Sequence, residues 1–393
     1  MLTVTKKGDD LHQTNKPRIM VCPLDWGLGH ATRCIPLIKE FIRNSAEVTI
    51  AGDGHGIELL KHEFPELKVI RLKGYNIRFS KYLPLSLVLL LRLPELVYRV
   101  IHEHQSIKQI IKDNHIDILV SDNRYGLWNK QVLSVFITHQ LNIIPPRPLG
   151  FLAPLLRKIT RWFISRYDEC WIPDTEGNDN LSGLLSHGYP YPSFAQFVGP
   201  LSRFEELNSL NNKQTSKYSY PIVAILSGPE PQRTILERKL IEQLSLLEAK
   251  SLIIRGIPES NKHRSNYSNE QGKLNTHGKI DVISAITSDH LFDVLKSRPV
   301  IISRGGYSTL MDLAMTGNKL IAIPTPGQTE QLYLAKKGAL EGKCIMANQD
   351  EFNIQHCLTK VSETKGYAVE ISNIRYKEAI HNLLSAANNR NTL

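Results

Sequence analysis

Residues 298–335 read RPVIISRGGYSTLMDLAMTGNKLIAIPTPGQTEQLYLA. The apolar run Val300–Ser303 predicts a buried parallel strand, and a glycine turn follows it. A helical pattern then runs from Tyr307 to Thr316, where a glycine ends it. A second strand over 319–323 leads through Pro-Thr-Pro-Gly into another helix, which Gln328 opens. This alternation of strands and helices predicts an α/β domain with a parallel sheet.

The glycine turn of this stretch is a candidate phosphate site. Gly305 and Gly306 precede a helix, and the first N–H groups of a helix have no partner within it and can hold an anion. The turn also follows the carboxyl end of a parallel strand, where open α/β sheets bind ligands. We therefore expect a ligand of this domain to lie at the turn.

The stretch resembles the donor-binding half of GT-B glycosyltransferases, and most closely the family that adds N-acetylglucosamine to the lipid-linked muropeptide of peptidoglycan. That family carries Ser-Arg-Ser-Gly, a carboxylate on the next helix and a Gln-Gln pair. This chain has Ser303-Arg304-Gly305-Gly306, Asp312 and Glu330-Gln331. The resemblance implies two Rossmann-like domains with a cleft between them and a UDP-sugar as donor.

By the same resemblance, Gly305 and Gly306 face the diphosphate, with Ser308 and Thr309 behind them on the helix. Asp312 faces the ribose hydroxyls, and Glu330 and Gln331 face the sugar hydroxyls. Asp312 is one methylene shorter than the usual Glu, and Glu330 replaces a Gln. These two departures leave the sugar open between an N-acetylhexosamine and a hexose.

Composition sets the class of protein. A length of 393 residues suggests two domains, and 41% hydrophobic with 22% charged residues is typical of a globular protein. The net charge of +10 suits an anionic substrate or an anionic lipid surface, and no nucleic-acid motif accompanies it. The five cysteines are odd in number and form no C-x-x-C, and the segment Met1–Lys16 is polar and lacks a signal-peptide pattern. We therefore expect a cytoplasmic protein with reduced thiols and a mobile N-terminal tail.

A second glycine loop lies near the N-terminus. Strand Arg18–Pro23 is followed by Asp25-Trp26-Gly27-Leu28-Gly29 and then by a helix from about His30 to Arg43, in which Pro36 predicts a kink or an early end. His30 would sit at the helix N-terminus, where the dipole disfavours imidazolium. A general base must be neutral, so His30 is the candidate base and Asp25 is its competitor or its orienting group. The alternative for His30 is a capping or packing role.

This loop resembles two known glycine loops. One opens the N-terminal domain of the same transferase family, and its histidine is a proposed base. The other is the G-x-G-H-x-x-R-C loop of a UDP-sugar hydrolase of pseudaminic acid synthesis, which matches Gly27 to Cys34 here. The first implies deprotonation of an acceptor hydroxyl and the second implies activation of water. In both reactions the anomeric carbon is attacked and a nucleoside diphosphate leaves.

Other strand ends predict the acceptor side of the cleft. Strand Ile116–Ser121 is followed by Asp122 and Arg124, and strand Val132–Thr138 ends at His139. Because carboxyl ends of parallel strands meet at one edge, these three residues should join Gly27, Gly29, Asp25 and His30 in one cleft. Loop capping is the equal alternative for all three.

The remaining segments define the domains. The first domain should span 17–199, with further strands Glu47–Ala51, Leu67–Leu72, Tyr167–Pro173 and Phe194–Gly199 and a helix Ile57–Glu63. A polar linker over 199–220 leads to a second domain of 217–370, with strands Ile222–Leu226, Leu252–Arg255 and Ile280–Ile283 and a helix Thr234–Leu247. Pro258–Lys279 is predicted to be a flexible surface insertion. By the resemblance, a helix within 371–393, patterned over Val369–Ala387, returns to the first domain.

The turn after Ile222–Leu226 is a further phosphate candidate. The family has a glycine-serine-glutamine-glycine loop here, and this chain keeps Ser227-Gly228 and Gln232. Arg233 adds a charge that can contact phosphate. There is no D-x-D motif and no His/Cys cluster with ligand spacing, so we expect no metal and no cofactor besides the UDP-sugar substrate. Helix N-termini, with Arg304 or Arg233, would then stabilise the leaving diphosphate.

Two segments are apolar and basic. Tyr82–Leu93 is too short to span a bilayer. Leu149–Arg166 combines apolar side chains, among them Phe151, Leu155, Leu156, Trp162 and Phe163, with the basic Arg157, Lys158, Arg161 and Arg166. Both can be core helices with solvated charges, or they can lie on an anionic membrane as a peripheral attachment at its inner face. The sequence leaves both open.

The function predicted from these patterns is that of an inverting, UDP-sugar-dependent glycosyltransferase (hexosyltransferase) with an unknown, lipid-linked or other acceptor. The alternatives are a UDP-sugar hydrolase or 2-epimerase of the same fold. A non-catalytic sugar-nucleotide-binding regulator is the alternative of another class.

Overall fold

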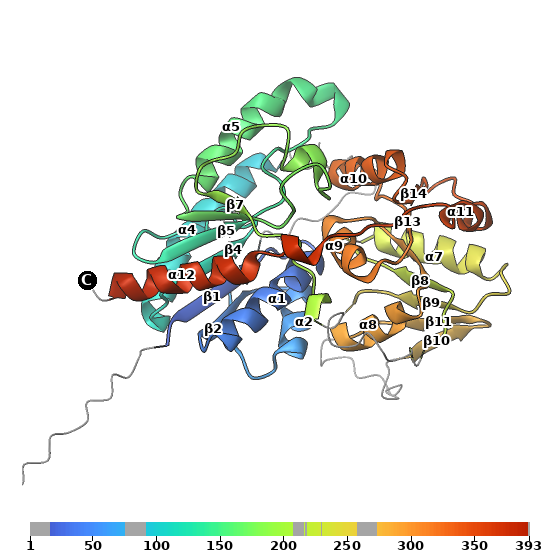
Figure 1. Ribbon diagram of the computed structural model, residues 1–393, viewed down its shortest axis with the longest axis horizontal. Coiled ribbons are helices and arrows are strands. Elements are labelled where there is room, and N and C mark those ends of the chain that lie inside the picture. The colour runs from blue at the N-terminus through green and yellow to red at the C-terminus, as the bar shows by residue number, and fades with distance from the viewer. Residues whose placement is uncertain are drawn as a thin grey trace, which may run out of the picture.

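The computed structural model describes residues 16–74, 92–206, 216, 218–228, 230–257 and 273–391. Two seven-stranded sheets lie side by side, each covered by helices on both faces (Figure 1). This arrangement confirms the α/β class and the two sheets expected from the sequence. The segments Met1–Asn15 and most of Tyr82–Leu93 lie outside the described residues, as do the middle of the linker and most of Pro258–Lys279.

The first sheet has the strand order β3-β2-β1-β4-β5-β6-β7, and all its pairings are parallel. Its residues Ile19, Met20 and Val21 are fully buried without alternation, as expected where helices cover both faces of a sheet. The elements of this domain are β1 (Arg18–Pro23), α1 (Gly29–Arg43), β2 (Glu47–Gly52), α2 (His55–Glu63), β3 (Lys68–Arg71), α4 (Leu93–Asn114), β4 (Ile118–Asp122), β5 (Leu133–Ile137), η1 (Arg147–Leu152), α5 (Ala153–Ile164), β6 (Glu169–Ile172), η2 (Gly183–Leu185) and β7 (Ala195–Phe197).

The second sheet has the order β10-β11-β9-β8-β12-β13-β14 and is parallel except for β10. Its elements are β8 (Ile222–Ile225), α7 (Gln232–Leu244), β9 (Ser251–Ile254), β10 (Lys273–His277), β11 (Ile280–Ile283), α8 (Ser288–Lys296), β12 (Val300–Ser303), α9 (Tyr307–Thr316), β13 (Leu320–Ala322), α10 (Thr329–Leu340), β14 (Ile345–Met346), α11 (Ile354–Val361), η4 (Ile371–Asn373) and α12 (Tyr376–Asn391). The bounds of β11, β12 and α9 match the sequence patterns to the residue.

The chain returns to the first domain at its end. The helix α12 packs on α1, and it crosses in front of the first sheet in Figure 1. The Arg375 N–H donates to the Val198 carbonyl at 2.9 Å. Gly199 has φ of +78°, and a Cβ there would collide with the backbone of Asn373. A glycine is therefore required where the returning segment crosses the end of β7.

Two local predictions need correction. Of the kink or early end expected at Pro36, the early end is wrong, because α1 continues to Arg43. Proline removes one backbone hydrogen bond, but residues 31–38 of α1 are all buried, and this packing offsets the loss. The last part of the predicted insertion Pro258–Lys279 is a strand. Its polar residues Lys273–His277 form β10, which pairs antiparallel with β11 at the edge of the sheet.

Candidate active site

The carboxyl ends of β1, β4 and β5 bring His30, Asp122 and His139 together. These strands are neighbours in the sheet, and His30 lies in the first turn of α1. His30 Nδ1 is 3.0 Å from Oδ2 of Asp122, whose side chain is fully buried at the end of β4. If Nδ1–H donates to this carboxylate, Nε2 on the opposite edge of the ring is left to accept a proton. This is the geometry of an oriented general base.

Arg33 lies one turn after His30 in α1 and holds the same carboxylate. Its Nε donates to Asp122 Oδ2 at 2.8 Å, and its Nη2 donates to Oδ1. Burial alone would raise the pKa of Asp122, but Arg33 and His30 outweigh burial and hold that pKa below its usual range. Burial would lower the pKa of Arg33, which the charge of Asp122 nevertheless raises. Asp122 is therefore a buried, ionised carboxylate.

Arg33 also affects the tautomer of His30. Its Nη2 is 2.8 Å from His30 Nδ1, so this nitrogen faces both a donor and the acceptor Asp122. Only the tautomer with its hydrogen on Nδ1, donated to Asp122, leaves Nε2 as a base. The cluster thus acts as a base only while Asp122 outcompetes Arg33 for that nitrogen.

His139 links this cluster to the second domain. Arg33 Nη1 can only donate, so His139 Nδ1 accepts from it at 3.0 Å, and the proton of the neutral ring lies on Nε2. Nε2–H then donates to Oε1 of Glu330 at 3.0 Å, in the first turn of α10. Burial lowers the pKa of His139 against the opposing effect of Glu330, which agrees with a neutral ring.

Glu330 faces the first domain. The amide of Gln140 also donates to it, and the ring of His139 stacks on Tyr307 with centroids 4.1 Å apart. Burial would raise the pKa of Glu330, but the contact with His139 and the charge of Arg33 lower that pKa. Its neighbour Gln331 instead turns into its own domain, where Oε1 accepts from Thr325 N at 2.8 Å. Of the predicted sugar-binding pair, only Glu330 lies between the domains.

The two glycines of the N-terminal loop, Gly27 and Gly29, are favoured at their positions for different physical reasons. Gly27 has φ of +84°, which favours glycine in the turn. At Gly29 the reason is the approach of the second domain: Ser308 Oγ donates to the Gly29 carbonyl at 2.8 Å. A Cβ on Gly29 would lie 2.8 Å from that same hydroxyl oxygen. The candidate base therefore sits directly beside the first turn of α9.

The donor-side turns meet around the start of α9. Gly305 has φ of +64° and Gly228 has φ of +95°, so both turns depend on glycine. Gly306 caps α9, and a Cβ there would meet nothing within 4 Å, which leaves room beside the free N–H groups of that helix. Ser227 and Thr309 are partly exposed at these two loops. The arrangement suits an anionic group, as the glycine pattern predicts.

Asp25 and Arg124 do not lie where the sequence suggested. The carboxylate of Asp25 packs against Gly74, where any Cβ would collide with it, and Asp122 is the carboxylate bound to His30. Arg124 is fully buried, and its Nε donates to Glu103 at 2.7 Å. The strand-end rule locates the edge of the sheet, but it does not say toward which side a loop residue turns.

The two arginines expected at the diphosphate are held by the protein. Arg304 is 1% exposed and donates to the side chain of Gln349 at 2.6 Å and to the carbonyls of Gln232 and Ile323. Burial lowers its pKa to about 10. Arg233 donates to the Arg255 carbonyl at 3.2 Å and pairs with a neighbouring glutamate. Both arginines thus hold the loops that form the site, and their expected phosphate contacts stay predictions.

Asp312 is also engaged by protein. Its carboxylate accepts from Ser202 Oγ at 2.8 Å and from Arg203 Nε at 3.2 Å, both in the segment between the domains. Burial raises the pKa of Asp312 against the opposing effect of Arg203. In this structure Asp312 therefore anchors the linker, and its ribose contact stays a prediction.

Asp312→Ala separates the two roles. We expect the free energy of unfolding to fall by about 1–3 kcal/mol, the scale for hydrogen bonds to a charged group, with little change in UDP affinity. Chemical denaturation and calorimetry would measure the two quantities. Ser202→Ala is the matched control, because it removes one of the same bonds from the linker side. A large loss of UDP affinity at unchanged stability would restore the ribose contact.

The sequence patterns did not single out three residues of this cluster, nor Thr325 beside the donor-side turn at Gly228. Arg33 was visible only as the arginine of the G-x-G-H-x-x-R-C phrase, and Gln140 only as the residue after His139. Tyr307 was counted as the start of a helix, yet its hydroxyl donates to the Pro173 carbonyl at 2.7 Å and its ring supports His139. Thr325 is buried, and among the described groups its hydroxyl has no partner.

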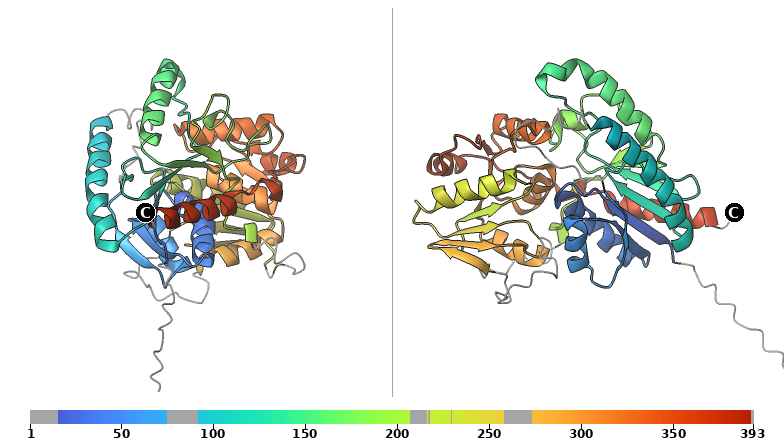
Figure 2. Two further views of the ribbon diagram at one scale, coloured as in Figure 1. Left: turned by 60° about the vertical axis from the view of Figure 1, so that its left-hand side comes forward. Right: turned by 180° about the vertical axis from the view of Figure 1, so that it is seen from behind.

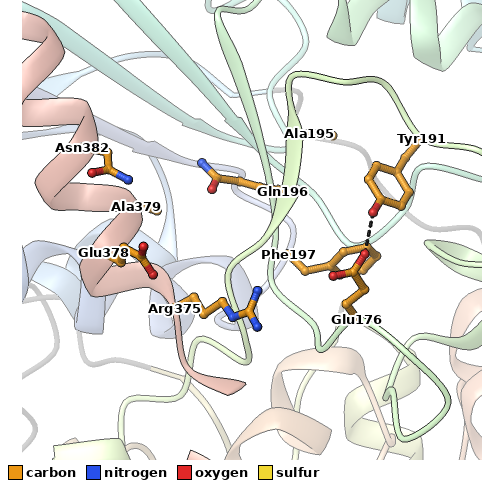
Figure 3. Close-up of a pocket in the computed structure, with 9 residues that line it drawn as sticks. All are labelled: Glu176, Tyr191, Ala195, Gln196, Phe197, Arg375, Glu378, Ala379 and Asn382. Carbon is orange, nitrogen blue, oxygen red and sulfur yellow. Dashed lines mark hydrogen bonds between the residues drawn. The ribbon is translucent and has the colours of Figure 1, made fainter. Parts of the chain in front are cut away.

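A polar cavity of about 250 Å³ lies apart from this cluster, between β7 and the start of α12 (Figure 3). Tyr191 donates to Glu176 at 2.7 Å on one side, and Arg375 points toward them from the other side. Its lining consists of Glu176, Tyr191, Ala195, Gln196, Phe197, Arg375, Glu378, Ala379 and Asn382. None of the predicted site residues lines it.

Within the described residues, no group of three or more His, Cys, Asp or Glu side chains is arranged to hold a metal ion. The helices in this part of the chain include none with the length and apolar character to cross a membrane.

Comparison with known proteins supports the fold. Residues 224–378 match the model of the glycosyltransferase family 28 C-terminal domain. An uncharacterized glycosyltransferase of Methanosarcina mazei is 24% identical over 387 residues, which cover 91% of this chain and 93% of that protein. One of Methanopyrus kandleri is 24% identical over 326 residues, or 80% and 88% of the two chains.

Solved structures agree over nearly the whole chain. The glycotransferase of kitacinnamycin has a TM-score of 0.58 at 13% identity, covering 95% of this chain and 96% of its own. A Streptomyces glycosyltransferase complexed with thymidine diphosphate has a TM-score of 0.53 at 11% identity, with coverage of 94% and 96%. These likenesses confirm the predicted GT-B fold. The finer resemblance to the transferases of peptidoglycan synthesis stays a prediction.

Proposed function

We propose that this chain, which combines the GT-B fold with a segment matching the glycosyltransferase family 28 C-terminal domain, transfers a sugar from a UDP-sugar to an acceptor hydroxyl with inversion. The observation that carries the proposal is the pair of His30 with the buried Asp122 beside the first turn of α9. A proton acceptor and an anion-binding helix N-terminus are the two parts that such a displacement needs. The sugar is a hexose or an N-acetylhexosamine.

In the proposed reaction, His30 Nε2 takes the proton of the acceptor hydroxyl. The hydroxyl oxygen then forms a bond to the anomeric carbon, and the bond from that carbon to the diphosphate oxygen breaks. The leaving oxygen keeps the electron pair, and the N–H groups at the start of α9 stabilise its charge. One direct displacement inverts the anomeric configuration. Asp122 holds the imidazole and stabilises the imidazolium that forms.

A specific observation favours hydrolysis as the second candidate. The Ser308–Gly29 contact brings the two domains together at the base, and such a closed cleft suits water better than a large acceptor. A 2-epimerase shares the fold and is the third enzyme candidate. A binding protein without turnover would keep the donor turns but would not use His30.

Nucleoside diphosphate release separates these candidates. The protein is incubated with a panel of UDP-sugars and thymidine diphosphate sugars, with and without a lipid extract as the source of acceptors. For a transferase we expect release from one UDP-sugar that rises at least tenfold with the extract, since water is a poor substitute for a bound acceptor. Equal release without the extract would identify a hydrolase. Calorimetric binding with no turnover of any donor would leave a binding protein.

We extend the proposal to an enzyme of the cytoplasm that works at the inner face of a membrane on a lipid-linked acceptor. The resemblance of the donor half to transferases with such an acceptor motivates this extension. Attachment to a membrane surface can be tested independently of the sugar donor.

A further inference from the structure

One helix of the first domain exposes an apolar stripe. Phe151, Leu155, Ile159 and Trp162 form what we call the α5 stripe, and their exposed fractions are 75%, 54%, 43% and 55%. The spacing of four, four and three residues places them on one side of the continuous η1–α5 segment. Thr160 and Ile164 lie on the buried side. The helix therefore packs through one face and presents a second apolar face to solvent.

Basic side chains flank this stripe. The segment 141–167 contains five Arg and Lys residues and no Asp or Glu. The guanidinium of Arg166 lies 4.3 Å from the ring centroid of Trp162, and Arg157 lies 3.6 Å from that of Tyr189. Lys158 is exposed, and Arg161 donates to the Pro190 carbonyl. Their positive charge is thus held beside the apolar side chains.

We infer that the α5 stripe docks the protein on an anionic membrane surface. Helices that lie in the membrane interface place Trp, Phe and Leu in the acyl boundary and Lys or Arg among anionic headgroups. A second copy of the chain is a poorer occupant, because pairing two stripes would bring the four described basic side chains of each copy together without a carboxylate from either segment. Charge complementarity therefore selects the lipid surface.

The position of the stripe connects it to the candidate active site. The chain leaves the cluster at His139 and Gln140 and enters η1 at Arg147. The helix α5 then projects at the outer end of the first domain, in Figure 1 and from behind in Figure 2. A protein docked through the stripe would hold its acceptor-side domain against the membrane. The inference does not rest on the transfer reaction, because docking requires no turnover.

Vesicle co-sedimentation tests the inference. The full chain is mixed with vesicles of phosphatidylcholine alone, or with 30% phosphatidylglycerol, at about 50 mM and 500 mM salt. We expect binding to the anionic vesicles at low salt, release at high salt, and weak binding to the neutral ones. The double variant L155D/W162D should lose at least tenfold in binding. K158E should lose about fivefold or more on anionic vesicles only.

Leu246→Asp is the matched control. Leu246 is 82% exposed after α7 in the second domain, so the variant adds an aspartate at another exposed leucine and should bind vesicles like the wild type. Light scattering of the proteins without vesicles tests whether a second copy of the chain occupies the stripe instead. Absence of binding to both vesicles would overturn the inference, as would equal binding to both. A dimer that L155D/W162D dissociates would assign the stripe to self-association instead.

Discussion

Replacing His30 by alanine is expected to lower kcat by about 10²–10⁴-fold, the usual loss for a general base, and to leave UDP affinity unchanged. The nucleotide is proposed to bind at the turns around Gly228 and Gly306 in the second domain. His30 belongs to α1 of the first domain. Steady-state kinetics with the donor found in the panel, together with calorimetry of UDP, would separate the two effects.

The reason for the loss is the pairing of His30 with a buried carboxylate. Asp122→Asn should therefore also lose activity, because an amide at this position can donate to Nδ1 and so favours the tautomer with the hydrogen on Nε2.

His55→Ala is the matched control for this substitution. His55 is the exposed first residue of α2 and also follows a glycine turn, but it takes no part in the hydrogen bonds of the His30 cluster. Its variant should turn over normally. If Asp25→Asn abolished activity while His30→Ala kept the wild-type rate, Asp25 would be the base and the assignment of His30 would be wrong.

Replacing Arg33 by methionine is expected to lower the free energy of unfolding by about 3–5 kcal/mol, the scale for removing one partner of a buried ion pair. Arg33 is 1% exposed, and Asp122 is fully buried. Methionine keeps the length and the apolar stem but leaves the carboxylate with His30 and the Cys34 thiol, which lies 4.0 Å away. Denaturant unfolding monitored by tryptophan fluorescence would measure the change.

The pH dependence gives a second readout of the same pair. The pKa of Asp122 lies below its usual range in the folded protein, so its contribution is present above the pKa of the unfolded chain and is lost as pH falls. In the Arg33→Met variant this carboxylate can be protonated, and a neutral buried acid costs less than a buried charge. The difference from the wild type should therefore shrink toward pH 4.

Two further variants control this prediction. Arg43→Met makes the same substitution on α1 at a half-exposed arginine that pairs with Glu206, and it should cost no more than about 1 kcal/mol. The double variant Arg33→Met/Asp122→Asn removes both charges and should recover part of the stability. If Arg33→Met were no more destabilising than Arg43→Met, the buried pair would not stabilise the fold.

Predictions from the sequence succeeded where the signal is local. The apolar run Val300–Ser303 and the helical pattern Tyr307–Thr316 match β12 and α9 to the residue. Side-chain periodicity and glycine turns depend on residues close together in the chain, so a sequence displays them directly. The same holds for the α5 stripe, whose mixture of apolar and basic residues was visible before its exposure was known.

Partners of the site residues could not be predicted in this way. Asp25 is near His30 in sequence, yet Asp122, 92 residues away, is the carboxylate that meets it, because β4 lies beside β1 in the sheet. Glu330 was expected to face only a sugar, yet His139 and Gln140, at separations of about 190 residues, hold it across the domains. Such contacts depend on strand order and on domain approach, which no local pattern encodes.

The sequence by itself determined the α/β class, the two-domain plan and the glycine turns that open α1 and α9. The tertiary structure alone decided which charges are buried and what they contact. It placed Arg304 in the protein interior although its motif suggested a phosphate contact, and it placed Arg33 at the centre of the candidate site. The physical reason is that burial and pairing are properties of the space around a side chain, and that space is built by segments far apart in the chain.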